Sequence, residues 1–188
     1  MGNTQNNEED LKISDSKIDL LPVKLNKRFV EKNYDSLKWG ISIYHLFFSL
    51  WATYKLFQIL LQVPNDVLYT IPVIIFIVTS TLGGILLLKG KSNAYNYLIA
   101  AQIPQVIVFQ LNTFVYFLLI GQWIILRVGG PGFFGINFGI LEVKYACTFL
   151  QVKQNFLIGI NLVPLILIFI LLKMEEMEQE MYTSLEAK

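Results

Sequence analysis

The acidic and basic residues of this 188-residue chain lie in blocks, and long uncharged stretches separate the blocks. No Asp, Glu, Lys or Arg occurs between Asp66 and Lys89, between Lys91 and Arg127, or between Lys153 and Lys173. A soluble domain carries charges distributed over its surface. Uncharged apolar stretches of roughly 20 residues are instead long enough to cross the hydrocarbon core of a bilayer. The pattern therefore predicts an integral, multi-pass membrane protein.

The uncharged stretches predict an all-α membrane protein built as a bundle of four transmembrane helices. The expected spans are residues 39–61 and 67–88, with two further spans inside residues 95–126 and 155–172. The third stretch is longer than one straight crossing needs, so part of it is expected to tilt or protrude. The four-helix transmembrane domain is expected to occupy residues 41–173, with a short extended loop on the outer side.

Three flanking segments complete the predicted organisation. Residues 1–20 are rich in Asn, Asp and Glu and predict a flexible polar tail. Residues 21–40 have apolar and basic faces at helical spacing, which predicts an amphipathic juxtamembrane helix. Residues 174–188 predict an acidic helical tail. Because this tail is acidic and the juxtamembrane helix is basic, we expect them to pack together, with Met177 and Met181 covering Val30, Tyr34 or Leu37.

Basic residues near the predicted spans set the expected orientation. Five basic residues lie close before the first span, within residues 24–38. Lys89 and Lys91 lie between the second and third spans, and the connection at residues 62–66 carries no basic residue. The positive-inside rule then places both termini in the cytoplasm, with the protein in the cell (inner or plasma) membrane. In the outer loop, residues 141–149 alternate between apolar and polar types, which predicts an extended segment that forms a short hairpin.

Polar side chains inside the predicted spans are the candidate functional residues. They form a possible polar intramembrane seam that comprises Gln102, Gln105, Asn112, Thr113, His45 and Asn161. Such a seam commonly packs helices together through hydrogen bonds, and it can also line a pathway for a polar solute. His45 is interpreted as a neutral imidazole bonded across a helix interface, because the predicted spans contain no acidic partner. Ser80 and Gly84 form a small-xxx-small pair that allows another helix to approach closely.

Several classes of site are not supported by the sequence. Residues 130–135 match G-x-G-x-x-G, but they lack the strand, helix and acidic ribose partner that a dinucleotide site requires. One cysteine, Cys147, and one histidine exclude a disulfide framework and a thiolate zinc site. No nucleophile has a histidine or carboxylate that can be placed beside it. We therefore predict no enzyme activity, no cofactor or metal, and no binding of nucleotide or nucleic acid.

The predicted role follows from what remains. The chain is expected to be a non-enzymatic membrane subunit or accessory protein that acts through helix packing. The alternative is a small-solute or ion transporter or channel that uses the polar face of the third span. The expected partners are the lipid bilayer and either further copies of the chain or another membrane protein.

Overall fold

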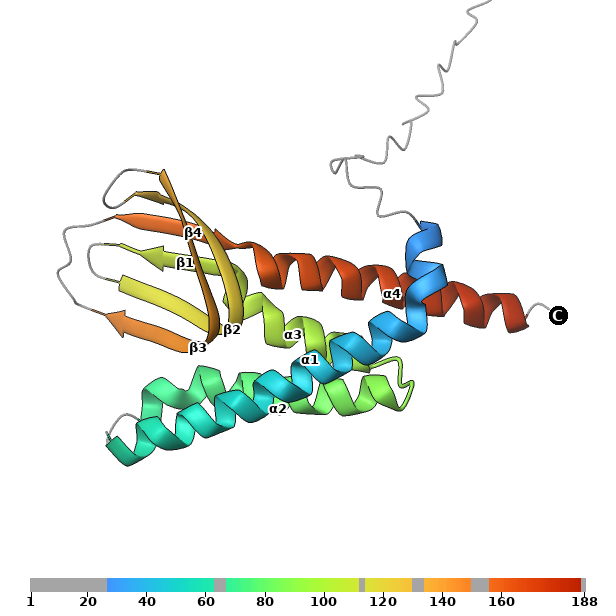
Figure 1. Cartoon of the computed structure of the whole chain (residues 1–188), viewed down its shortest axis with the longest axis horizontal. Coiled ribbons are helices and arrows are strands. Elements are labelled where there is room, and N and C mark those ends of the chain that lie inside the picture. Colours follow the sequence, from blue (N-terminus) through green and yellow to red (C-terminus); the bar gives the residue numbers. More distant parts are fainter. Residues whose placement is uncertain (1–26, 63–66, 112–113, 130–133, 150–155, 187–188) are drawn as a thin grey trace, which may run out of the picture.

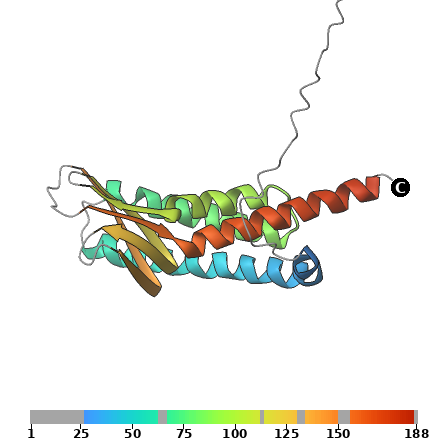
Figure 2. The same ribbon diagram turned by 90° about the horizontal axis from the view of Figure 1, so that it is seen from above.

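The computed structural model describes residues 27–62, 67–111, 114–129, 134–149 and 156–186. Within these ranges the chain forms four helices and four strands (Figure 1). The elements, in chain order, are α1 (Lys27–Gln62), α2 (Val67–Leu88), α3 (Ala94–Val106), β1 (Ile107–Gln110), β2 (Phe114–Gly129), β3 (Phe134–Phe149), β4 (Leu157–Asn161) and α4 (Leu162–Glu186). The helices run side by side, and the sheet lies at one end of them (Figures 1 and 2).

The predicted all-α four-helix bundle is wrong, because the fold is mixed α and β. The third predicted span, residues 95–126, is helical only as far as Val106 and then becomes β1 and β2. Its second half is rich in branched and aromatic side chains, which favour strands. An unbroken apolar run shows no period that separates a buried strand from a buried helix. The secondary structure predicted for this run is therefore wrong beyond Val106.

The fourth predicted span, residues 155–172, is also divided between two kinds of structure. It begins as β4, and α4 starts only at Leu162, with Pro164 in its first turn. Proline is well tolerated there because the first backbone N–H groups of a helix have no partner inside the helix. The extended segment predicted for residues 141–149 is confirmed, since all of it lies in β3.

The multi-pass assignment is corrected together with the fold class. Among the described helices, one stretch, Thr70–Leu88 in α2, is long and apolar enough to cross a membrane, with a mean hydropathy of 2.5. Of this stretch, 33% is buried. The core helix of a soluble protein can have the same length and composition. Among the described helices, one rather than four is therefore long and apolar enough to be a candidate membrane span.

All strand pairings in the described sheet are antiparallel, in the order β1-β4-β2-β3, and β1 also pairs with β2. The 16-residue β2 reaches three partners: its start pairs with β1, its end with β4, and nearly all of it with β3. Leu118 and Ile120 of β2 pack with Phe48 of α1 and Phe76 of α2. This cluster joins the sheet to the helices.

Helices α1 and α2 pack closely where the small residues of α2 face α1. A Cβ atom at Gly84 would stand 3.3 Å from the backbone oxygen of Ser42 and 3.0 Å from the Leu46 side chain. The close approach expected for Ser80 and Gly84 is therefore confirmed, and α1 is the helix that approaches. At the end away from the sheet, Ile41, Leu87, Ala94 and Leu171 form a second buried cluster that draws on all four helices.

The acidic tail is the continuation of α4, and it packs on the N-terminal part of α1. Met174 and Met177 are buried in the second cluster, and Tyr34 and Leu37 pack against the same cluster. The Tyr34 hydroxyl donates a hydrogen bond to Glu178 Oε2 at 3.2 Å. The predicted contact between tail and juxtamembrane helix is confirmed for these residues. The side chains of Val30 and Met181, and the tail of residues 1–20, lie outside the described part.

Candidate functional site: the bulge between β2 and β3

The pairing of β2 with β3 is interrupted at one place. The register shifts between the pairs Gly121–Glu142 and Trp123–Gly139. Between these pairs β2 has one residue, Gln122, and β3 has two, residues 140–141, so the extra residue of the bulge lies in β3. Gly121 adopts a φ of +88°, and a Cβ atom there would stand 2.6 Å from the Phe48 ring. Glycine is therefore needed both for the backbone conformation and for the contact with α1. Bulges of this kind occur preferentially beside functional sites, where they redirect a side chain.

Two buried amides bond to the β2 backbone on either side of the bulge. Gln105 Oε1 accepts a hydrogen bond from Ile120 N at 2.9 Å, while its Nε2 donates to Ala101 O at 3.2 Å. Asn161 Oδ1 accepts from Ile124 N at 3.1 Å and from Val163 N at 3.4 Å. Each amide thus supplies the acceptor that a backbone N–H near the register shift needs.

The other predicted seam residues are distributed differently. Gln102 is 2% exposed on α3, whereas Asn112 and Thr113 lie outside the described residues. His45 contacts a different part of the protein from Gln105. Its Nδ1 lies 2.8 Å from Ser80 Oγ, and the Ser80 hydroxyl donates a hydrogen bond to the His45 backbone oxygen at 3.2 Å. The structure therefore places Gln105 and Asn161 at the bulge and puts His45 between α1 and α2.

The His45–Ser80 pair resembles a base and a nucleophile, but its position excludes a substrate. Both residues are 0% exposed. His45 Nε2 has no hydrogen-bond partner among the residues that the structure describes. A catalytic base needs a third group that orients its ring and a reacting atom within reach. The pair is better explained as a polar contact that holds α1 against α2, as the sequence predicted for His45.

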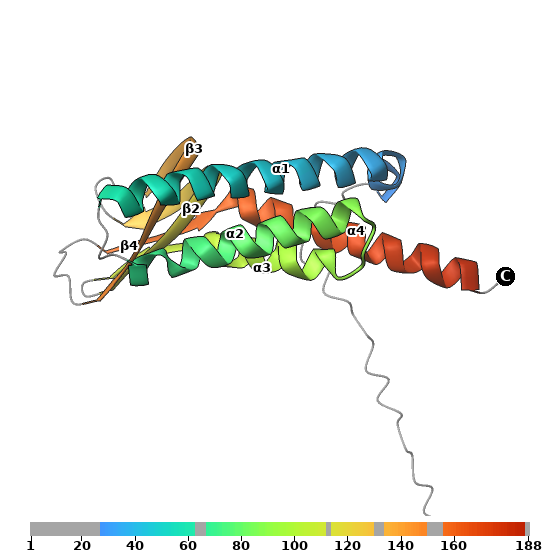
Figure 3. The ribbon, with the colours of Figure 1, turned by 90° about the horizontal axis from the view of Figure 1, so that it is seen from below.

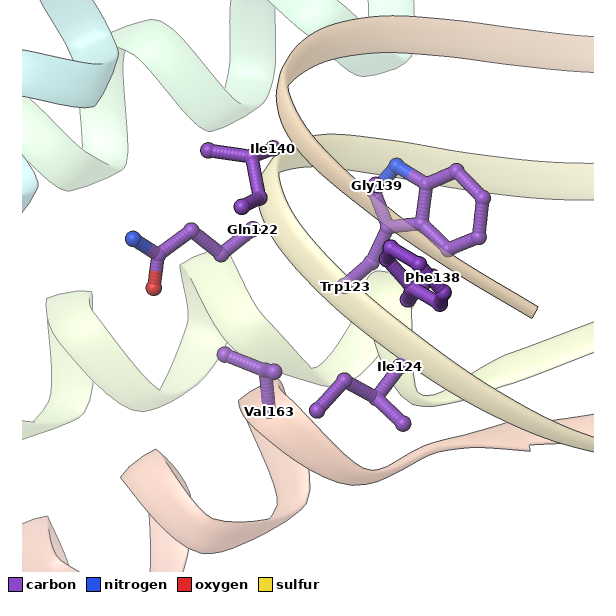
Figure 4. A pocket seen from close by; sticks show the side chains of 7 residues that line it. All are labelled: Gln122, Trp123, Ile124, Phe138, Gly139, Ile140 and Val163. Atoms are coloured by element: carbon purple, nitrogen blue, oxygen red, sulfur yellow. The ribbon is translucent and has the colours of Figure 1, made fainter. Parts of the chain in front are cut away.

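A pocket of about 260 Å³ opens at the bulge. Figure 4 shows the residues that line it, from β2, β3 and the first turn of α4: Gln122, Trp123, Ile124, Phe138, Gly139, Ile140 and Val163. The walls are mainly apolar, and the Gln122 amide points away from the Trp123 ring (Figure 4). We call this cavity the bulge pocket.

Charged and aromatic side chains of β2 and β3 meet beside Gly139. Trp123 is 7% exposed, and Lys144 Nζ lies 5.2 Å from the centre of its ring. Lys144 Nζ also forms an ion pair with Glu142 Oε2 at 2.9 Å. Sequence reasoning missed Gly139 and Glu142. The one signal was Gly121 inside an apolar run, because an isolated glycine in a strand often marks a bulge.

A second polar cluster ties α4 to α1 and α3 at the far end. The Tyr34 and Tyr95 hydroxyl oxygens are 2.9 Å apart, and Tyr34 also bonds to Glu178. Tyr95 is 0% exposed. Burial, and in second place the hydrogen bonds with Tyr34 and Glu178, raise the pKa of Tyr95 well above its usual range. The folded protein therefore keeps this phenol protonated.

This cluster predicts sensitivity to alkaline pH. The unfolded chain releases the Tyr95 proton near pH 10, while the folded chain retains it. Stability is then fully present below about pH 10 and is lost as the pH rises further, by about 1.4 kcal/mol for each pH unit. Urea unfolding between pH 8 and 11 should show a shallower loss for Tyr95→Phe than for the natural chain. Equal slopes would contradict the assignment.

No group of three His, Cys, Asp or Glu side chains that could hold a metal ion occurs in the described ranges. Comparison of the chain with protein-family models, with curated proteins and with solved structures finds no match. The function is therefore argued from the surface and the contacts of this chain.

Proposed function

We propose that this chain is a non-enzymatic, membrane-bound protein that holds the outer face of α1 against lipid and acts through packing with its neighbours. The observation that carries the proposal is a stripe of large apolar side chains on the outer face of α1. We call it the α1 stripe; it comprises Trp39, Ile43, Phe47, Leu50, Tyr54, Phe57 and Leu61. These residues follow helical spacing and are 49% to 71% exposed.

The surroundings of the α1 stripe favour lipid over water. Apart from His45, which is buried, the described residues from 39 to 88 contain one basic side chain, Lys55, and no acidic one. Lys55 lies over the rings of Trp51 and Tyr54, at 5.2 and 5.8 Å from their centres. Aromatic rings with a long basic side chain are typical of a membrane interface, where the charge reaches the headgroups.

Lipid also explains the exposed apolar surface better than one protein partner would. Contiguous apolar patches above a few hundred Å² are rare on soluble monomers. Here α2 exposes its own row, Ile71, Ile74, Ile75, Val78, Leu82 and Ile85. Helix α4 adds Leu165, Ile166 and Leu172, and α3 adds Ile103. The exposed apolar surface therefore extends beyond the α1 stripe to three further helices.

The basic side chains mark one boundary of this apolar surface. Lys38 Nζ lies 3.3 Å from where a Cβ atom of Gly90 would stand, between Lys89 and Lys91. Lys173 follows Leu171, which is buried in the cluster that contains Leu87 and Ala94. The α2–α3 connection and the start of α1 lie at the end away from the sheet (Figure 3). We assign this basic end to the cytoplasmic side of the cell membrane, in accord with the positive-inside rule.

The buried amides favour packing over transport. A solute pathway needs polar groups that can bond to the solute, but both ends of the Gln105 side chain bond to the protein backbone. Gln105 and Asn161 instead hold β2 against α3 and α4. The transporter or channel remains the alternative function, and the flotation experiment below does not depend on it.

The proposal predicts that the purified chain binds neutral phosphatidylcholine vesicles and floats with them in a density gradient at high salt. Phe47→Lys/Leu50→Lys places two charges in the α1 stripe, where each charge disfavours contact with lipid hydrocarbon. This variant should remain at the bottom while keeping its circular dichroism spectrum. Ser36→Lys/Asn96→Lys adds the same charge at exposed positions outside the stripe and should float. Equal flotation of both variants would overturn the proposal.

A further inference from the structure

The outer edge of β3 has no neighbouring strand in the described sheet. The strand order is β1-β4-β2-β3, so β2 pairs with one side of β3, and the backbone groups on the other side meet no described strand. An open edge of this kind is a template for pairing with a further strand. The extended segment ends at Leu141, where φ is 57° and the backbone oxygen accepts a hydrogen bond from Trp51 Nε1 of α1 at 2.9 Å. We call residues 134–140 the β3 edge.

The β3 edge lacks the features that usually keep exposed edges apart. Natural edge strands are protected by lysine, proline, inward-pointing charges or short length. Residues 134–140 contain no proline and no charged residue, and they belong to a strand of 16 residues. One face of the β3 edge instead carries large apolar side chains that are 61% to 76% exposed, namely Phe134, Ile136, Phe138 and Ile140. An apolar strand therefore fits this edge better than a charged one.

The apolar face continues from the β3 edge across the sheet. Ile124 of β2 lies opposite Phe138, and Val128 lies opposite Phe134. Val128 in turn lies opposite Ile158 of β4. Opposite residues in neighbouring strands share a face of the sheet. Since Ile124, Val128 and Ile158 are 41% to 44% exposed, a strand added at the β3 edge would extend an apolar face that already spans three strands.

The sequence of the β3 edge matches itself when it is read in the opposite direction. The segment reads Phe-Gly-Ile-Asn-Phe-Gly-Ile, with Asn137 at its centre. If two such segments pair antiparallel about Asn137, a large apolar residue lies opposite a large apolar residue at four positions. Glycine lies opposite glycine at two positions. The two Asn137 side chains then face each other across the symmetry axis.

We propose that the β3 edge binds the β3 edge of a second copy of this chain, antiparallel and centred on Asn137. Ile136 then lies opposite the partner's Phe138, and Phe134 lies opposite the partner's Ile140. A two-fold arrangement of this kind uses the open edge of both copies, so it closes as a dimer and does not grow into a fibre. It joins the two sheets into one and places both apolar faces on the same side.

Asn137 sets the register of this pairing. The residues on either side of it on that face are Gly135 and Gly139, and their own chain covers both: added Cβ atoms would stand 3.0 Å from Arg127 Cζ and 2.5 Å from Trp123 Cε2. The exposed Asn137 amide has both donors and an acceptor, so two such amides can bond to each other. A single polar residue in an apolar interface fixes its alignment in the same way in coiled coils.

This inference rests on the proposed function, because it names the neighbour with which the chain packs. The α1 stripe takes no part in the pairing. The flotation experiment and the following tests can therefore fail separately. A chain that floats with vesicles but does not dimerise would contradict the pairing alone.

Disulfide formation tests the register in the full chain, purified in mild detergent, in a Cys147→Ser background. Ile136→Cys and Phe138→Cys chains, co-expressed, should form a disulfide on mild oxidation, because opposite Cα atoms lie about 4.5–5.5 Å apart. Either variant alone places its cysteines two residues out of register, at about 7–8 Å. We expect about tenfold more covalent dimer from the pair than from either variant alone. Ile160→Cys is exposed on the same face, but in β4, and should form none.

Charge reversal at Asn137 tests the symmetry axis. Asn137→Lys places two like charges opposite each other and should weaken dimerisation by about tenfold in sedimentation experiments, with an unchanged circular dichroism spectrum. Asn137→Asp should do the same, and an equal mixture of the two variants should restore the dimer. Asn96→Lys, exposed on α3, should leave dimerisation unchanged.

Three results would overturn the proposal. The natural chain could sediment as a monomer, which would show that lipid or a strand of another protein covers the β3 edge. The Ile136→Cys and Phe138→Cys pair could yield no more covalent dimer than either variant alone. The dimer could also persist undiminished in Asn137→Lys.

Discussion

Gly129→Ala should prevent the sheet from forming, and it is the substitution with the largest expected effect. Gly129 has a φ of +98°, and an added Cβ atom would stand 2.1 Å from the backbone oxygen of Phe156. The backbone that precedes β4 cannot yield as a flexible side chain can, so the end of β2 would separate from β4. We expect a destabilisation above about 4 kcal/mol, which is exceptional for a single substitution. Thermal unfolding followed by circular dichroism measures it.

Gly40→Ala is the matched control for this prediction. A Cβ atom at Gly40 would meet nothing within 4 Å, and the residue lies inside α1. Alanine in a helix is favoured over glycine by about 0.5–1 kcal/mol, so this variant should unfold at a slightly higher temperature. If both variants unfold at the same temperature, the close contact between β2 and Phe156 is contradicted.

Asn161→Leu should have the second largest effect. Its carbonyl oxygen accepts from Ile124 N and Val163 N, and the residue is 0% exposed. Leucine would leave both backbone donors unpaired beside the bulge, at about 1–3 kcal/mol each. We expect a loss of 2 to 6 kcal/mol on that basis, which is about the sum of the two losses. Chemical denaturation of the full chain measures the change.

Asn96→Leu provides the comparison, because Asn96 is exposed near the start of α3. Exposed substitutions without special contacts change stability by less than about 0.5 kcal/mol. A comparable loss in the two variants would show that the Asn161 hydrogen bonds do not hold β2 in place. The backbone amide hydrogens of β2 near Ile124 should also exchange with deuterium faster in Asn161→Leu than in the natural chain.

The sequence predicted the helices correctly where a clear boundary ends an apolar run. Residues 39–61 and 67–88 were predicted as helices, and they lie in α1 and α2. The boundary at the end of α2 is marked by Lys89 and Gly90, where φ is +65°. Such a helix end is a local signal, since glycine readily adopts this conformation after the last turn.

The sequence failed where the same apolar run changes from helix to strand. Nothing between Ala94 and Val128 carries a charge except Arg127, so no boundary separates α3, β1 and β2. Pro104 does not mark the boundary either, because it lies inside the last turn of α3. The choice between helix and strand depends on pairing with β3 and β4, which lie far along the chain. Local patterns cannot report such pairing.

The candidate site was predicted in part. Gln105 and Asn161 were identified as buried polar residues, but their expected partners were side chains of other helices. Their observed partners are the backbone N–H groups of Ile120 and Ile124 in β2, on either side of the register shift. The bulge pocket was not predicted, because it depends on Gly139 and Trp123 meeting across two strands.

The most direct test of the membrane proposal compares two exposed positions on α1. Leu50, 71% exposed, lies in the α1 stripe, and Ser36 is exposed before the stripe begins. A nitroxide label would be attached to Leu50→Cys or Ser36→Cys in a Cys147→Ser background, with the chain in phospholipid vesicles. Power-saturation electron paramagnetic resonance should show the Leu50 label colliding mainly with oxygen, and the Ser36 label mainly with a water-soluble nickel chelate. Equal access of the nickel chelate to both labels would contradict the proposal that the α1 stripe meets lipid.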